Sequence, residues 1–431
     1  MPGDPHGITS WMPTIADVMK IQGYATGQFG KNHLGDHDEH LPTNHGFDEF
    51  FGNLYHLNAE EEPEGYFYPK DPEFKKKYGP RGVLHTHADG KGGQKIEDTG
   101  PLNTKRMPTV DEEFLAAAQK FIDTSVKDRK PFFVWFNTTR MHVFTHLKPE
   151  SLGKTGKGIH ADGMVEHDGM VGQLLKQLDD LGIADNTIVL YTTDNGAEIA
   201  LWPDGAMTPF RSEKGTTWEG GFRIPMMVRW PGVIKPGTVK NDIFASLDWL
   251  PTLVNIAGGP KGDGLKKQIE AGQYPGIVKT TLDGTDQRDY LEGKSQKSAR
   301  DTFFYYSGKD PSAVRYKNWK MYFAMVSDAP AGFTVGVIPY HWTQVVNIKR
   351  DPFEISIGSQ YKTLMGVGGA ISSPSTAYQY DWNMLPIGQA LWLKELETYV
   401  NYPPLQNPAS YNLDQVMQQV KEMKASSHAG E

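Results

Sequence analysis

The alternation of short apolar runs with amphipathic segments constrains the fold of this chain more than any other feature. Two apolar runs, rich in β-branched and aromatic residues, lie at residues 131–137 and 187–191, and we predict a strand at each. Residues 111–127 and 171–178 precede them with apolar side chains at helical spacing. Because continuous apolar strands are typical of parallel sheets, we expect an α/β fold with a mixed, mostly parallel sheet flanked by helices. The run at residues 131–137 should be buried on both faces.

A change of pattern near residue 296 indicates a second domain. The chain has 431 residues, which is too long for one ordinary core. Short aromatic strands joined by tight turns follow the change and predict a small antiparallel sheet. These strands are expected at residues 302–306, 313–316 and 319–323. We therefore predict an α/β domain over residues 1–296 and a smaller α+β subdomain over residues 297–431.

The N-terminal third contains one strong helix signal and one polar stretch. Thr14 can cap a helix, and Asp17 three residues later completes a capping box. Gly23 should end this helix, and residues 24–29 are a strand candidate. Residues 60–106 are polar and rich in Gly, Lys, His and Pro, so we predict a long loop there.

Composition excludes several classes of function. The formal net charge is -8, from 44 Lys+Arg against 52 Asp+Glu, which gives no global electrostatic reason to bind nucleic acid. No apolar run reaches the length of a membrane span, and the first residues show no signal peptide. The chain has no cysteine, which removes disulfides, thiolate zinc sites and thiol nucleophiles.

Polar clusters follow several predicted strands. Asp194 and Asn195 come after the strand at residues 187–191, and their oxygens suit Ca²⁺ or Mg²⁺, although the same residues also form ordinary turns. Lys31 and His33 follow the strand at residues 24–29, and they share a face if the segment is extended. A cation and an imidazole on one face suit an oxyanion ligand. The alternative is that this segment is a solvated loop.

Two further clusters contain a histidine and a lysine. His142 lies just beyond residues 131–137, but His146 is close enough in sequence that the pattern alone does not choose between them. Lys214 is followed by Gly215 and two threonines, which favours either an anion-binding loop or a scaffold turn. Because all four clusters lie at strand ends, together they predict an oxyanion site with one hard cation.

These segments, in this order, resemble the sulfatase family of the alkaline-phosphatase superfamily, and bacterial arylsulfatases in particular. The matching stretches are residues 14–20, 23–24, 30–35, 45–48, 131–133, 193–198 and 214–221. The resemblance implies an alkaline-phosphatase-like fold and hydrolysis of sulfate esters. Its expected partners are a sulfated small molecule or a sulfated glycan.

The resemblance also implies roles for individual residues. Asp194 and Asn195 would bind one Ca²⁺, in a site that this chain completes only in part. His33 would orient the nucleophile, and His56, where the match is looser, would line the same pocket.

Three more residues would hold the sulfate oxygens and take part in catalysis. They are Lys31, His142 and Lys214, with Lys214 also near the leaving-group oxygen. The distance from the preceding strand favours His142 over His146 for this role.

The family nucleophile is a formylglycine made from Cys or Ser in a C/S-x-P/A-x-R motif, and this sequence does not contain it. The nearest serine candidate begins at Ser312 and has neither the spacing nor the required Pro or Ala. The paired aspartates that open the family's first strand are also missing. We therefore expect an N-terminally truncated sulfatase that is inactive by itself. The family suggests a periplasmic or secreted location.

Two other functions remain open from the sequence. A phosphatase or phosphodiesterase of the same superfamily would use two zinc ions and usually has His where this chain has Asn195. A pseudoenzyme that binds oxyanions or sulfated glycans without turnover would keep the binding residues and lack the nucleophile. The sequence predicts no oligomeric state.

Overall fold

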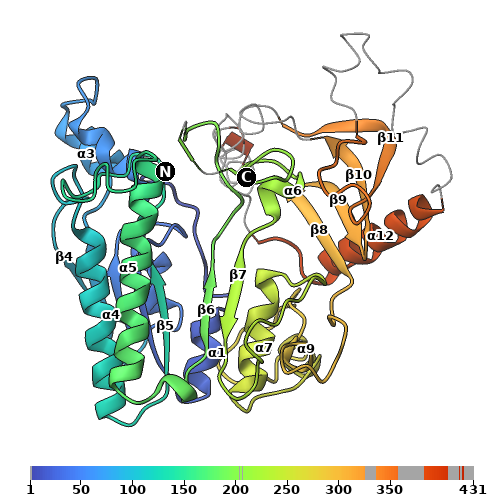
Figure 1. Cartoon of the computed structure of the whole chain (residues 1–431), viewed down its shortest axis with the longest axis horizontal. Helices are drawn as coiled ribbons and strands as arrows, with labels where there is room; N and C mark the ends of the chain where they lie inside the picture. The colour runs from blue at the N-terminus through green and yellow to red at the C-terminus, as the bar shows by residue number, and fades with distance from the viewer. Residues whose placement is uncertain are drawn as a thin grey trace, which may run out of the picture.

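The computed structural model describes most of the chain. It covers residues 2–202, 204–205, 207–325, 336–357, 383–405, 417, 420 and 421. Figure 1 shows a first sheet covered by long helices in the N-terminal part of the chain, and a second sheet built by residues after 300. Among the described residues, no helix is both long enough and apolar enough to cross a membrane.

The first sheet has five strands in the order β4-β3-β2-β1-β5. The strands are β1 (Ala25–Gly30), β2 (Glu49–Gly52), β3 (Leu84–Ala88), β4 (Gln94–Asp98) and β5 (Phe132–Asn137). Strand β1 is parallel to both β2 and β5, whereas the β2–β3 and β3–β4 pairs are antiparallel. The predicted α/β fold with a mixed sheet is therefore confirmed.

Helix α4 (Val110–Lys127) covers one face of this sheet and forms its main core. Its side chains at Phe114 and Ala118 are fully buried and pack in one cluster with Phe29 of β1. Helix α5 (Ile159–Asp180) packs along α4 on the outside (Figure 1). The apolar spacing of residues 111–127 thus predicted both the helix and the face that it buries.

Helix α1 (Ile15–Ile21) packs against β1 and α7 (Trp249–Ile256). The predicted capping box is present: Thr14 Oγ1 accepts from Asp17 N at 3.0 Å, and Asp17 Oδ2 accepts from Thr14 N at 3.0 Å. Gly23, with a φ of 86°, follows the end of the helix and lets the chain turn directly into β1.

The prediction of a long loop at residues 60–106 is wrong. This segment contains α3 (Pro72–Tyr78) and the antiparallel strands β3 and β4, which extend the first sheet. In β3 the buried positions are Leu84 and Thr86, and they alternate with histidines. A strand with a polar residue on its buried face and imidazoles on the other lacks the apolar alternation that identifies strands in a sequence.

The expectation that residues 131–137 are buried on both faces is also wrong. Within the described residues, β5 pairs with β1 alone and so forms an edge of the first sheet, and Trp135 is 44% exposed. The next strand, β6 (Val189–Thr192), belongs to a separate two-stranded sheet with antiparallel β7 (Met226–Arg229). One side of β5 and one side of β6 therefore have no strand partner among the described residues.

The predicted antiparallel sheet after residue 300 is confirmed, in the order β11-β10-β9-β8. Its strands are β8 (Thr302–Ser307), β9 (Asp310–Tyr316), β10 (Trp319–Met325) and β11 (Ile338–Asn347). Helix α12 (Met384–Asn401) lies against this sheet (Figure 1). Its Trp392 belongs to a buried cluster with Val314 and Met321 of the sheet. The domain boundary at residues 296–297 stays a prediction, and part of the predicted subdomain lies outside the described residues.

Short helices connect these parts. The α-helices are α2 (Leu57–Glu61), α6 (Glu219–Phe222), α8 (Gly264–Glu270) and α9 (Arg288–Leu291). Single turns of 3-10 helix lie at Asp38–His40, Pro42–Asn44, Glu62–Glu64, Ala184–Asn186 and Ser246–Asp248.

Candidate functional site

The predicted site residues follow the carboxyl ends of four strands and influence one another electrostatically. Lys31 and His33 follow β1, His56 follows β2, His142 follows β5, and Asp194 follows β6. Gly30 makes the first of these turns possible. Its φ is 108°, and a Cβ there would lie 1.7 Å from the carbonyl oxygen that ends β5.

Three imidazole rings lie next to one another in this site. The ring centroids of His33 and His56 are 5.5 Å apart, and those of His56 and His142 are 5.9 Å apart and nearly parallel. His142 Nδ1 lies 3.0 Å from the carbonyl oxygen of Val143, which can only accept, so this nitrogen carries the proton. His142 Nε2 is then left as an acceptor in the neutral ring.

Two lysines and three imidazoles lie close enough at this site to interact electrostatically. Burial, and then the nearby charge of Lys31, lower the pKa of both His33 and His142 to about 4. Burial also lowers the pKa of Lys31, which Asp194 partly opposes and Lys214 reinforces. The histidines are therefore neutral at pH 7, and an anion placed between the two lysines would relieve their repulsion.

Lys214 lies on a loop that is fixed to the segment after β6. Its Nζ lies 3.0 Å from Glu198 Oε2, and its backbone N donates to Ala197 O at 2.8 Å. Gly196 permits a close backbone contact between the segment after β6 and Gly220 of α6, because a Cβ on Gly196 would lie 1.9 Å from Gly220 O. The segment after β6 and the loop before α6, both distant from β1 in the sequence, thus bring a second lysine to the site.

Asp194 and Asn195 offer oxygen atoms to a cation. The Asp194 carboxylate is exposed and has one long contact, 3.4 Å from Thr193 Oγ1. Asn195 Nδ2 donates to Gly196 O at 2.9 Å, which directs its other amide atom, the oxygen, elsewhere. The donor chemistry fits a hard cation, but Ca²⁺ takes about six to eight oxygens, so these residues supply only part of such a site.

The structure separates the two histidines between which the sequence pattern did not choose. His142 lies in the imidazole group, whereas His146 Nε2 lies 2.7 Å from Glu61 Oε2 and pairs with that carboxylate instead. The assignment of a sulfate-holding role to His142 remains a prediction, as do the roles of the other site residues.

Two positioning groups were missed in the sequence. Glu198 pairs with Lys214, and its place within the 193–198 stretch was the only signal for it. Asp111 and Arg140 form a buried pair, with 2.6 Å between Arg140 Nη1 and Asp111 Oδ2, and Asp111 also accepts from Thr139 N at 2.8 Å. This pair holds the segment that leads from β5 to His142, and no local pattern predicts it.

The depressed histidine pKa values predict a specific pH response. The unfolded chain protonates these rings near pH 6.5, whereas the folded chain resists protonation until about pH 4. Their contribution to stability is therefore present above about pH 6.5 and is lost as the pH falls toward 4. Histidine resonances in an NMR titration should include two that titrate near pH 4, and sulfate should raise both values. His142→Gln should remove one of them; titration of every histidine near pH 6.5 would contradict the prediction.

Comparison with known proteins identifies the family. The sulfatase family model matches residues 2–259. Human arylsulfatase A is 29% identical over 393 residues, covering 86% of this chain and 70% of the relative. Bovine arylsulfatase A is 33% identical over 323 residues, covering 72% of this chain and 58% of the relative. The chain thus spans well under two thirds of the bovine protein.

Solved structures agree on the fold. The PsFucS1 sulfatase from Pseudoalteromonas sp. has a TM-score of 0.77 at 24% identity, covering 94% of this chain and 77% of that one. Ps i-CgsB, solved in complex with k-i-k-neocarrahexaose, has a TM-score of 0.64 at 21% identity, covering 98% and 82%. The family match over more than half of the chain is decisive: the protein belongs to the sulfatase family of the alkaline-phosphatase-like superfamily.

Proposed function

We propose that this chain supplies the sulfate-holding part of a sulfuric ester hydrolase. The observation that carries the proposal is the mutual electrostatic effect of Lys31, Lys214 and the imidazole group. Lys31 and the imidazoles follow the ends of β1, β2 and β5, whereas Lys214 comes from the loop between β6 and α6. Two cations and imidazole N–H groups suit a tetrahedral anion, whose oxygens only accept hydrogen bonds. Lys31 and Lys214 would hold its oxygens, together with His142 once the bound anion has raised its pKa and Nε2 is protonated. His33 and His56 would line the nucleophile side.

A single Ca²⁺ is part of this proposal. Asp194 and Asn195 would hold it, and when bound it would stabilise negative charge on the sulfate oxygens. Lys31 already has a favourable interaction with Asp194, so the cation and the lysine would lie on neighbouring sides of the anion. The remaining ligands would come from outside these two residues.

None of the 431 residues provides the family nucleophile. The 431 residues include no cysteine and no serine in the formylglycine motif, so the chain by itself is proposed to be inactive. β5 and β6 each have one side without a strand partner in the described part of the chain, and His167 of α5 bridges Thr138 at 2.9 Å and Tyr191 at 3.2 Å. A strand that pairs with these edges would carry its first loop toward the site.

The proposed substrate class is a sulfated small molecule or a sulfated glycan. Relatives named N-acetylgalactosamine-6-sulfatase support the glycan, and those named arylsulfatase support the small molecule. We propose a periplasmic or secreted location from the membership of the sulfatase family alone.

One alternative has a specific observation in its favour. Because the binding residues are present and the cysteine is absent, the chain would also serve as a sulfated-glycan binding pseudoenzyme. A two-zinc phosphatase is less well supported, since Asn195 offers an amide where imidazole would suit zinc.

The test compares sulfate binding with sulfate-ester hydrolysis in the purified 431-residue chain. We expect measurable sulfate binding by calorimetry and no detectable hydrolysis of para-nitrophenyl sulfate, with or without Ca²⁺, because no formylglycine can form. Turnover that disappears in Lys214→Ala would disprove the proposed inactivity. Absence of sulfate binding would overturn the proposed site. Lys176→Ala, which removes an exposed lysine of α5, is the matched control.

A further inference from the structure

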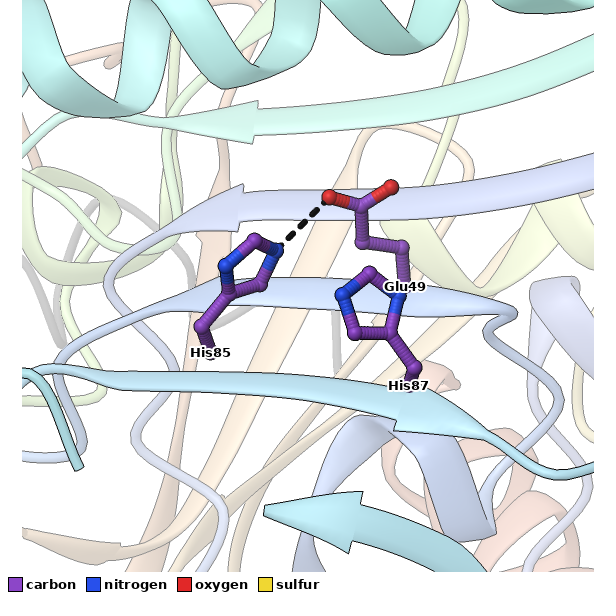
Figure 2. A group of neighbouring side chains, drawn as sticks. All are labelled: Glu49, His85 and His87. Carbon is purple, nitrogen blue, oxygen red and sulfur yellow. Dashed lines mark hydrogen bonds and ion pairs between the residues drawn. The ribbon is translucent and has the colours of Figure 1, made fainter. Parts of the chain in front are cut away.

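A second group of ligand-type side chains lies on the first sheet, at Glu49 of β2 and His85 and His87 of β3. Figure 2 shows the carboxylate and the two imidazoles gathered above the two strands. One ligand atom from each residue lies within 4.8 Å of the other two. None of these residues belongs to the proposed sulfate site.

The strand register explains why the three side chains meet. β2 and β3 are antiparallel, and Glu49 lies directly opposite His87 while Phe51 lies opposite His85. Residues two apart on a strand share a face, so His85 and His87 project to the same side as Glu49. The ring centroids of the two histidines are 4.6 Å apart. A regular, hydrogen-bonded ladder thus fixes the backbone positions of all three.

The spacing is close to that required by a tetrahedral metal. Zn–N and Zn–O bonds of about 2.0–2.2 Å place neighbouring ligand atoms about 3.3 Å apart. In the structure His85 Nε2 lies 2.8 Å from Glu49 Oε1, and every pair of ligand atoms lies within 4.8 Å. Side-chain rotations that move the ligand atoms by roughly 1–2 Å are sufficient to reach this spacing, with no movement of the strands.

The surroundings allow a metal to enter and be held. His87 is exposed, and the side chains of His85 and Glu49 are 31% and 22% exposed, so the group is open on one side. The other side is apolar, since the ring of Phe51 packs against His85 with centroids 4.9 Å apart.

We propose that Glu49, His85 and His87 form a binding site for a divalent transition metal, with Zn²⁺ as the test ion and one coordination position left open. Two imidazoles and a carboxylate suit zinc and its first-row neighbours, and they do not suit Ca²⁺ or Mg²⁺. Glu97 of β4 lies opposite His85 on the same face, and Lys95 lies opposite His87. The metal would link β2 to β3.

This site is separate from the sulfate site. Glu49 begins β2, whereas His56 follows its carboxyl end, so the two sites lie toward opposite ends of the same strand. Zinc binding here would therefore not depend on the proposed sulfatase activity, and the two proposals fail independently.

The test is calorimetric titration of ZnCl₂ into the full chain after treatment with a chelator. We expect one saturable equivalent that is lost in Glu49→Gln and in His87→Ala. It should remain in His37→Ala, which removes a half-exposed histidine elsewhere. Because His87 is exposed, its replacement should leave the fold intact, which thermal melting without metal will verify. Co²⁺ should give the visible absorption of a low-coordinate site in the parent chain and not in the two variants.

Three outcomes would overturn the proposal. The first is zinc binding that persists unchanged in both Glu49→Gln and His87→Ala. The second is a zinc equivalent that is lost only in His142→Ala, which would place the metal at the imidazoles of the sulfate site. Failure of the chain to bind any zinc would have the same consequence.

Discussion

Replacing Lys320 with methionine is expected to destabilise the folded chain by about 3–5 kcal/mol, because it leaves buried carboxylates without their cation. The Lys320 side chain is fully buried. Its Nζ lies 3.0 Å from Glu219 Oε1 and 3.3 Å from Glu354 Oε1, and it donates to Thr217 O at 2.8 Å. Methionine fills a similar volume, so the loss reports charge and hydrogen bonding more than packing.

The position of this lysine links stability to the proposed function. Lys320 lies on β10, whereas Thr217 belongs to the loop that carries Lys214 and Glu219 begins α6 directly after that loop. The variant should therefore also bind sulfate more weakly, because the loop loses its attachment to the second sheet. This second effect distinguishes a positioning role from a purely local loss of stability.

The pH dependence provides an internal check. Burial alone would raise the pKa of Glu219, but the charges of Lys320 and Arg315 outweigh it and hold this pKa below the usual range. In the parent chain Glu219 therefore contributes stability that is present above its unfolded pKa and lost as the pH falls. Without Lys320 the buried carboxyl should become protonated more easily, so the difference in stability should shrink toward acid pH.

Urea unfolding at several pH values measures these effects. Lys349→Ala is the matched control, since Lys349 is exposed next to β11 and its loss should change the free energy of unfolding by less than about 0.5 kcal/mol. A loss below about 1 kcal/mol for Lys320→Met, independent of pH, would show that the buried ion pairs do not hold this interface.

The features that sequence predicted are those that depend on local spacing. The capping box of Thr14 and Asp17, helix α4 and the polar residues at strand ends all follow from neighbours within a few positions. The strand ends placed Lys31 and His142 near one another because parallel strands bring their carboxyl ends to one edge. The resemblance to a family added roles that spacing alone left open.

The features that sequence missed depend on partners distant in the chain. Nothing near residues 131–137 shows that β5 is an edge strand, because pairing is decided by segments elsewhere. Lys320 lies in an aromatic strand, and no neighbouring residue indicates that its partners are Glu219 and Glu354. Glu219 lies 101 residues before it in the chain. The pair of Asp111 with Arg140 is hidden for the same reason. Charge pairs that close long loops need the fold before they can be recognised.

The second large effect is expected at the two lysines of the proposed sulfate site. Lys31→Ala and Lys214→Ala should each weaken sulfate binding by about 10- to 100-fold, since a hydrogen bond to a charged group contributes about 1.5–3 kcal/mol. Calorimetry at constant ionic strength measures this, with Lys176→Ala as the control that removes a lysine without touching the site. Affinities equal to that control would place sulfate elsewhere.

The pairing of Lys214 with Glu198 makes the two variants unequal. Without Lys214, the carboxylate that now lies 3.0 Å from its Nζ faces the anion unpaired and repels it. Lys214→Ala should therefore lose more affinity than Lys31→Ala, and adding Glu198→Gln to it should restore part of the loss. If Glu198→Gln instead weakens sulfate binding in the Lys214→Ala background, the glutamate positions the anion through other contacts, and the electrostatic account of this site is wrong.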